Sequence, residues 1–144
     1  MYLVDTNVIS ASAPGRSAPP GLGDWMDQNA SLLFLSSVTI AEVTEGIAKA
    51  RREGSTRKAD DLAAWLGAVL HLYPDRVLPF DASVAQTLGG LSDHARAIGR
   101  SPGLADLIIA ATAKHHGLTI LTRNVRHFAP LTVAVHDPYV SFPT

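Results

Sequence analysis

The chain has no cysteine, few aromatic residues and no excess of charge of either sign. The lack of cysteine excludes disulfides, thiol catalysis and cysteine-ligated zinc. Twelve Lys and Arg residues against thirteen Asp and Glu residues give a formal net charge of −1, which does not by itself indicate a nucleic-acid partner. No apolar run is long enough to cross a bilayer, and no basic and then apolar leader opens the sequence. We therefore expect a soluble, cytoplasmic protein with no membrane partner.

The size and apolar content of the chain predict one folded domain. It has 144 residues, of which 47% are hydrophobic. A chain of this length buries about two thirds of its unfolded surface on folding, so it needs no disulfide or metal to hold a core. We find no linker, repeat or low-complexity segment, and we treat residues 1–144 as a single domain.

Short apolar runs alternate with segments of helical periodicity. The apolar runs are continuous, which is typical of strands that are covered on both faces of a parallel sheet. The predicted fold is therefore α/β, a three-layer α/β/α sandwich with a short, mainly parallel central sheet. We expect a long helix to open at Thr39, and we place the strands at residues 2–4, 32–35, 77–78, 118–121 and 133–135.

Three acidic residues are placed where the elements of such a sheet meet. Asp5 follows the first strand, Glu42 is expected in the first turn of the helix after the second strand, and Asp106 is near the start of a later helix. Ligands of open α/β sheets bind outside the carboxyl ends of the strands. Three carboxylates gathered there repel one another, and Mg²⁺ or Mn²⁺ relieves this repulsion. Such a cation activates water and neutralises charge on a phosphate, which is the chemistry of phosphodiester hydrolysis.

Two of these acids also have simpler interpretations. Thr39 and Glu42 have the spacing of a capping box, in which Glu42 binds only the Thr39 backbone N–H. Asp106 in a first helical turn complements the helix dipole. Asp5 is harder to explain in this way, because an acid at the end of a buried strand is costly unless it is paired. The six histidines show no spacing typical of zinc ligands.

Five segments, taken in order, resemble the PIN-domain nucleases. The match runs from Tyr2 to about Tyr139, and one of its segments is typical of the FitB-like branch. A single Asp-Thr-Asn is weak evidence, whereas the ordered set is specific. The segments are VDTNVIS at 4–10, SVTIAEVTEGI at 37–47, LPFD at 78–81 (the FitB-like one), ADLIIAATA at 105–113, and LTILTRN at 118–124 together with DPY at 137–139.

The resemblance implies a VapC-type toxin, the ribonuclease half of a bacterial type II toxin–antitoxin pair. In that family, acids at the positions of Asp5, Glu42 and Asp106 bind Mg²⁺ or Mn²⁺ and activate the water that cuts RNA. Many relatives carry a fourth acid where this chain has Asn124 and His127. Because Asn124 can orient a water but adds no charge, we include it among the catalytic residues and expect a site for one metal.

The resemblance also implies partners. We expect an RNA substrate, a VapB-type antitoxin that inhibits the enzyme, a homodimer and a toxin–antitoxin hetero-oligomer. The aromatic content of 6% argues against a stacking platform for single strands and suits a folded RNA that is recognised by its shape. The resemblance implies that this RNA is of the tRNA or rRNA class. Arg123 is our candidate for a phosphate contact, and the assigned substrate-binding residues are Thr6, Asn7, Thr122 and Arg123.

Two other functions stay open at this point. One is a PIN-fold nuclease of RNA processing with no role as a toxin. The other is a catalytically weak protein that acts as the binding partner in an antitoxin–DNA complex, an alternative that the missing fourth acid keeps open.

Overall fold

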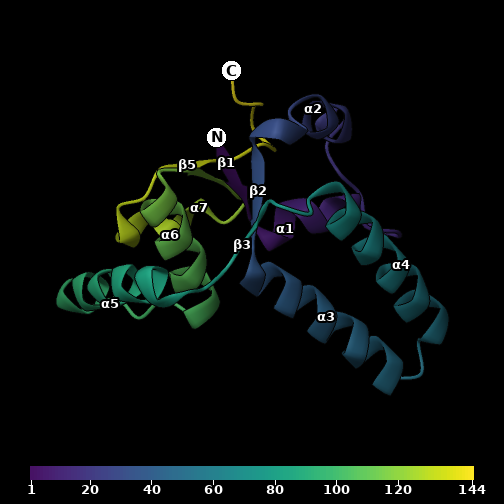
Figure 1. Ribbon diagram of the computed structural model, residues 1–144, viewed down its shortest axis with the longest axis horizontal. Coiled ribbons are helices and arrows are strands. Elements are labelled where there is room, and N and C mark those ends of the chain that lie inside the picture. Colours follow the sequence, from purple (N-terminus) through teal and green to yellow (C-terminus); the bar gives the residue numbers. More distant parts are fainter.

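The computed structural model describes residues 1–144, and five short strands form one parallel sheet at its centre (Figure 1). The order across the sheet is β3-β2-β1-β4-β5, and each neighbouring pair is parallel. The register pairs Leu3 of β1 with Phe34 of β2 and with Ile120 of β4. The strands are β1 (Tyr2–Val4), β2 (Leu33–Ser36), β3 (Val77–Leu78), β4 (Thr119–Leu121) and β5 (Val135–His136).

Helices connect the strands and cover both faces of the sheet (Figure 1). Three short 3₁₀ turns complete the fold at Ser10–Ser12, Ala30–Leu32 and Ala129–Leu131. The helices are α1 (Thr6–Ile9), α2 (Leu22–Gln28), α3 (Ser37–Arg52), α4 (Thr56–Leu72), α5 (Ala82–Ala97), α6 (Leu104–His116) and α7 (Val125–Phe128).

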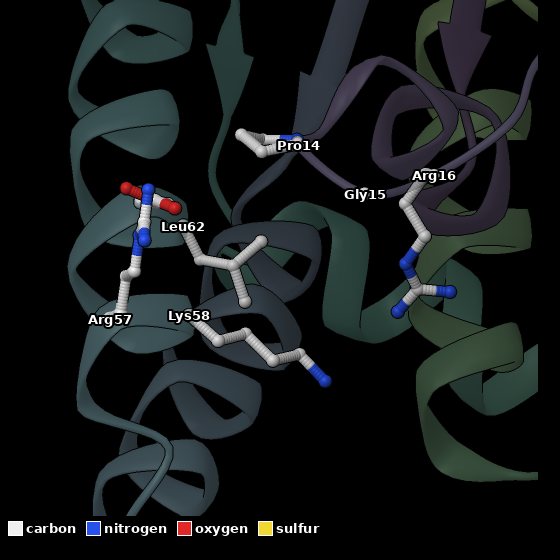
Figure 2. Close-up of a pocket in the computed structure, with 7 residues that line it drawn as sticks. Pro14, Gly15, Arg16, Arg57, Lys58 and Leu62 are labelled. Atoms are coloured by element: carbon white, nitrogen blue, oxygen red, sulfur yellow. The ribbon is translucent and has the colours of Figure 1, made fainter.

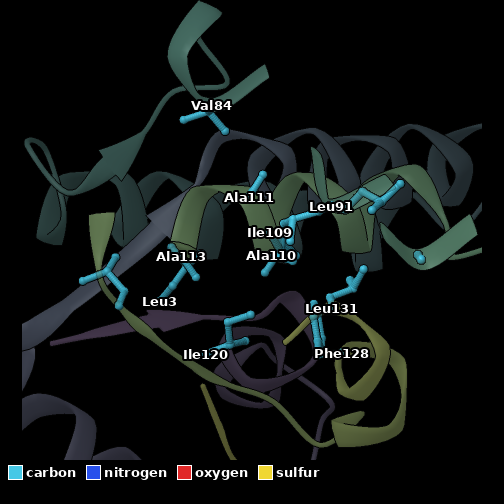
Figure 3. Close-up of a cluster of buried hydrophobic side chains, with 13 residues drawn as sticks. Leu3, Val84, Leu91, Ile109, Ala110, Ala111, Ala113, Ile120, Phe128 and Leu131 are labelled. Atoms are coloured by element: carbon cyan, nitrogen blue, oxygen red, sulfur yellow. The ribbon is translucent and has the colours of Figure 1, made fainter. Parts of the chain in front are cut away.

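Successive residues of the central strands point to two separate cores, as the alternation of side chains along a strand requires. Leu3 and Ile120 pack with residues of α5, α6 and α7 (Figure 3). Val4 and Leu121, each one position further along, pack on the other face with residues of α1, α2 and α4. Helices therefore cover both faces, and the predicted three-layer α/β/α sandwich with a parallel sheet is confirmed.

The long helices α3 and α4 form an antiparallel hairpin that has a small core of its own. Ile47 and Ala50 of α3 pack there against Ala59 of α4. In Figure 1 this hairpin extends on one side of the sheet's lower end and the pair α5 and α6 on the other. No helix of the structure combines the length and the apolar content that crossing a membrane requires.

The predicted start of the long helix was wrong. Helix α3 begins at Ser37, and its cap is Ser36, whose hydroxyl oxygen accepts from the Val38 N–H at 3.2 Å. Thr39 is therefore already inside the helix and is buried, so Glu42 lies in the second turn rather than the first. The capping box of Thr39 and Glu42 is not formed.

Candidate active site

The site lies at the carboxyl ends of the strands, next to the central strand β1, from which the strand order runs in opposite directions. The chain adds β2 and β3 on one side of β1, and β4 and β5 on the other. Ligands of open α/β sheets bind outside the carboxyl ends of the strands at such a switch point. Asp5 follows β1 and Thr122 follows β4, so these two residues face each other at this position.

The Asp5 carboxylate is buried, and both of its oxygens accept hydrogen bonds. Only 5% of the residue is exposed. Its Oδ1 accepts from the backbone N–H of Thr6 at 2.8 Å, because Asp5 is the N-cap of α1. Its Oδ2 accepts from the Thr122 hydroxyl at 2.7 Å and from the Asn7 amide at 3.3 Å. The end of a buried strand and the start of a helix thus fix this side chain without any basic partner.

Burial, first of all, raises the pKa of Asp5 above its usual value. The hydrogen bonds from Thr122 and from the Thr6 backbone lower it, while the negative charges of Asp106 and Glu42 raise it again. The two charges act because the fold brings both acids near Asp5, as the sequence predicted. The three carboxylates therefore share one electrostatic environment, in which a positive charge is favoured.

Thr122 links Asp5 to the loop that follows β4. Its hydroxyl accepts from the Asn124 N–H at 2.9 Å and donates to Asp5. Asn7 spans the same gap, since its side-chain oxygen accepts from the Arg123 N–H at 3.3 Å. Asn124 thus joins this network through its backbone, and its residue is exposed.

Glu42 is exposed and is held by α1. The Thr6 hydroxyl donates to Glu42 Oε1 at 2.7 Å and lies 3.0 Å from the hydroxyl of the buried Thr39. These contacts join α1 to α3, although the residues are more than thirty positions apart. From the sequence we assign Thr6 to substrate binding, and its contact with Glu42 leaves no sign there.

Asp106 lies in the first turn of α6, as predicted, and its partner is a histidine. His127 Nδ1 is 3.2 Å from Asp106 Oδ2. Both residues line a hollow of about 340 Å³, together with Arg100 and the loop at Ser101–Gly103. In the sequence, His127 is marked only as a position where many relatives carry an acid, and this departure is the one signal of its contact with Asp106.

The acids are close enough to act on one another, yet they do not form a ready-made metal cage. No group of three His, Asp or Glu side chains is gathered at metal-binding distance. Asp5 is fixed, whereas Glu42 is exposed and Asp106 is partly exposed. The donor set consists of hard carboxylate oxygens, which suits Mg²⁺ or Mn²⁺.

Arg123, the predicted phosphate contact, is exposed beside the site. Its guanidinium carbon lies 4.2 Å from the centre of the Tyr139 ring, so the ring supports the cation without neutralising it. Other basic residues lie on the hairpin of α3 and α4, and two of them, Lys49 and Arg52, line a hollow with Glu42. Arg57 and Lys58 line a hollow of about 430 Å³ with Arg16 (Figure 2), and Arg51 is paired with Asp60 at 2.7 Å.

The fold is that of a known family. A family model described as PIN domain matches residues 2–130. The chain belongs to the PIN domain family, as its sequence motifs predicted. Within that family it groups with the FitB and VapC toxins, as the following comparisons show.

Curated relatives match over nearly the full chain. The chain is 37% identical to Toxin FitB of Neisseria gonorrhoeae, a match that covers 96% of this chain and 99% of the relative. It is 33% identical to VapC ribonuclease Y4jK of Sinorhizobium fredii, with 96% and 98% covered. It is 29% identical to the tRNA(fMet)-specific endonuclease VapC of Shigella flexneri, with 88% and 89% covered.

Solved structures agree with these relatives. The structure of FitAcB from Neisseria gonorrhoeae matches with a TM-score of 0.85 and 35% identity, covering 96% of this chain and 99% of that one. A member of the VapBC family of toxin-antitoxin systems from Mycobacterium tuberculosis matches with a TM-score of 0.66 and 25% identity, with 93% and 94% covered.

Proposed function

We propose that this chain is the toxin of a type II toxin–antitoxin pair and acts as a metal-dependent endoribonuclease. The observation that carries the proposal is the buried Asp5 at the switch point of the sheet, within the field of Glu42 and Asp106. Burial disfavours the charged form of Asp5, and a cation bound beside it would offset this penalty. The relatives named VapC ribonuclease and Toxin FitB support the same activity.

Asp5, Glu42 and Asp106 are the proposed ligands of one Mg²⁺, with Mn²⁺ as an alternative. A bound divalent cation supplies Lewis acidity, because it neutralises the carboxylates, activates water and stabilises charge on the scissile phosphate. Thr122 and the Thr6 backbone orient Asp5, and the Thr6 hydroxyl orients Glu42. The Asn124 amide is the candidate for orienting a water, without adding charge.

The proposed substrate is a folded RNA of the tRNA or rRNA class. Two observations support this choice: the chain offers few aromatic side chains for stacking, and one relative is named a tRNA(fMet)-specific endonuclease. Thr6, Asn7 and Arg123 are the proposed substrate-binding residues. Thr122, which we also assigned to the substrate from the sequence, is fully buried and holds Asp5 instead. Arg123 is placed to bind phosphate because its guanidinium is exposed and held over Tyr139.

The proposed protein partner is a VapB-type antitoxin. The likeness to FitAcB and to a VapBC family member supports this partner. We extend the proposal to a homodimer of the chain within a toxin–antitoxin hetero-oligomer.

Cleavage of RNA by the purified protein tests the proposal. A mixed pool of tRNA, rRNA and unstructured RNA is incubated with Mg²⁺, with Mn²⁺ and with a chelator, alongside Asp5→Asn and Asp106→Asn. We expect cutting of folded RNA that needs metal and is lost in both variants. Cutting that survives the chelator or both substitutions would overturn the mechanism.

A growth assay separates a toxin from a nuclease of RNA processing. We expect expression of the chain to arrest growth, and expect Asp5→Asn at equal protein level to relieve the arrest. A protein that binds metal and antitoxin but cuts no RNA would instead support the alternative of a catalytically weak binding partner.

A further inference from the structure

One contact in the site has no part in the function proposed so far. His127 Nδ1 lies 3.2 Å from Asp106 Oδ2. The side chain of Asp106 is 29% exposed and that of His127 is 56% exposed, so the pair lies at the rim of the site. Asp106 and His127 line the same hollow, so a ligand in this hollow can reach the contact between them.

The backbone holds the imidazole in place. His127 belongs to the short helix α7, and its N–H donates to the Asn124 carbonyl at 2.9 Å. The next residue, Phe128, is fully buried in the core beneath α6 (Figure 3). Asp106 is fixed by the first turn of α6, which packs against α7. Two anchored helices thus present the imidazole to the carboxylate.

The structure holds the two atoms at contact distance. An ionised carboxylate can only accept, so a hydrogen bond formed across this contact places the proton on Nδ1. A neutral imidazole with its proton on Nδ1 satisfies this requirement, and so does a charged one. The contact occupies Oδ2 of Asp106 and leaves Oδ1 for another partner.

We propose that His127 is a positioning residue for Asp106: its Nδ1–H binds Oδ2, and Oδ1 is thereby presented to the cation. This inference rests on the proposed function, in which Asp106 is a metal ligand. Carboxylates that bind metals are themselves commonly fixed by hydrogen bonds, and loss of such a bond costs about 10–100-fold in metal affinity or activity.

Binding of Mn²⁺ by the full chain tests this role. Affinity is measured by calorimetry and by electron paramagnetic resonance for the wild type, His127→Ala and His127→Asn. His71→Ala is the matched control, because His71 is an exposed histidine on α4, outside the site. We expect His127→Ala to weaken Mn²⁺ binding about 10–100-fold, and His127→Asn, whose amide can donate from a similar place, to restore most of it.

Each result has one meaning. Unchanged Mn²⁺ affinity in His127→Ala, with normal binding by the wild type, overturns the role of His127 and leaves the proposed function intact. Absence of Mn²⁺ binding by the wild type contradicts the proposed function itself. Weak binding in both His127→Ala and His127→Asn overturns positioning and makes the imidazole a direct ligand. Thermal unfolding in chelator, which we expect to be alike in all variants because His127 is exposed, excludes a folding defect.

Discussion

At the scale of single residues, the bond from Thr122 to Asp5 tunes the acid at the centre of the site. This bond lowers the pKa of Asp5, which burial otherwise raises. We predict that Thr122→Val moves the acid limb of the pH profile of cleavage to higher pH, because the pKa of Asp5 rises when the bond is lost. We also expect cleavage to fall about 10–100-fold, as for other groups that orient a metal ligand. The pH dependence is measured at a fixed, subsaturating Mg²⁺ concentration.

Thr122→Ser is the matched control for this prediction. The serine keeps the hydroxyl that donates to Asp5 and accepts from Asn124. We expect its pH profile to follow the wild type. An unshifted acid limb in Thr122→Val would show that the bond does not control Asp5.

The same buried acid predicts how stability depends on pH. Because the pKa of Asp5 is raised in the folded state, its contribution to stability is complete below the pKa of the unfolded chain and is lost as pH rises through the folded pKa. Without metal, Asp5→Asn should therefore unfold at a higher temperature than the wild type at neutral pH. The difference should shrink as pH falls toward 4.

Thermal scans in chelator and in Mg²⁺ check this expectation. A change of 1 kcal/mol moves the Tm of a chain of this size by about 2–4 °C, so the difference is measurable. Mg²⁺ should stabilise the wild type and not Asp5→Asn. Asp93→Asn, which removes an exposed carboxylate on α5, controls for the change in charge. An Asp5→Asn protein that is less stable than the wild type in chelator would contradict the argument.

The three acids could be chosen as candidates from the sequence because each matches a family motif. Asp5 and Asp106 also follow a strand end and a helix start that were expected correctly, whereas the start expected for the helix of Glu42 was wrong. The partners of these acids could not be predicted. Thr6 contacts Glu42 and His127 contacts Asp106 across long separations in the chain, and such contacts leave no periodic pattern. They depend on how α1 packs on α3 and α7 on α6, which only the folded structure defines.

At the scale of elements, the start of α3 gives a prediction about stability. Ser36 caps this helix, whereas Glu42 binds Thr6. We predict that Ser36→Ala lowers the free energy of unfolding by about 1 kcal/mol, as for other lost caps. Glu42→Ala should change it by less than about 0.5 kcal/mol, as for other exposed positions.

Urea unfolding of both variants in chelator separates the two interpretations of Glu42. A capping box would make Glu42→Ala about as costly as the loss of a cap. Glu42→Ala should abolish cleavage while leaving the urea midpoint in place. A lowered midpoint for Glu42→Ala would restore the capping interpretation.

The strands of the sheet, like the start of α3, could be predicted from the sequence to within about two residues. Continuous apolar runs mark β1 to β4, and the fifth strand is at Val135–His136 rather than at the predicted 133–135. We expected α3 to open at Thr39, whereas Ser36 caps it. Thr39 is buried and its hydroxyl lies against that of Thr6, and this tertiary contact is not visible in local sequence.

At the scale of the whole molecule, the balance of charge limits how RNA is held. With a formal net charge of −1, the chain offers little long-range attraction. Affinity must come from a few cations near the site, and we take Arg100, Arg123 and Arg126 as these, all of them exposed. Three phosphate contacts predict a slope of about −2 for the logarithm of RNA affinity against that of salt concentration.

Salt titration of RNA binding in Asp5→Asn, which should not cut its substrate, measures this slope. Adding Arg123→Ala should make the slope shallower by about 0.7. Arg51→Ala is the control, since Arg51 is already paired with Asp60 on the outer hairpin, and it should leave the slope unchanged. Equal effects of the two substitutions would rule out a special role for Arg123.

The position of β1 also has a consequence for synthesis. This strand lies in the middle of the sheet and pairs with residues 119–121, which are made more than a hundred residues after it. The hydrogen bond from Thr122 to Asp5 likewise cannot form until Thr122 has been made. A chain that is still on the ribosome therefore contains Asp5 but cannot yet form the site. The site can form only after residues 119–122 have left the exit tunnel, so the chain is inactive while the segment before them is being made.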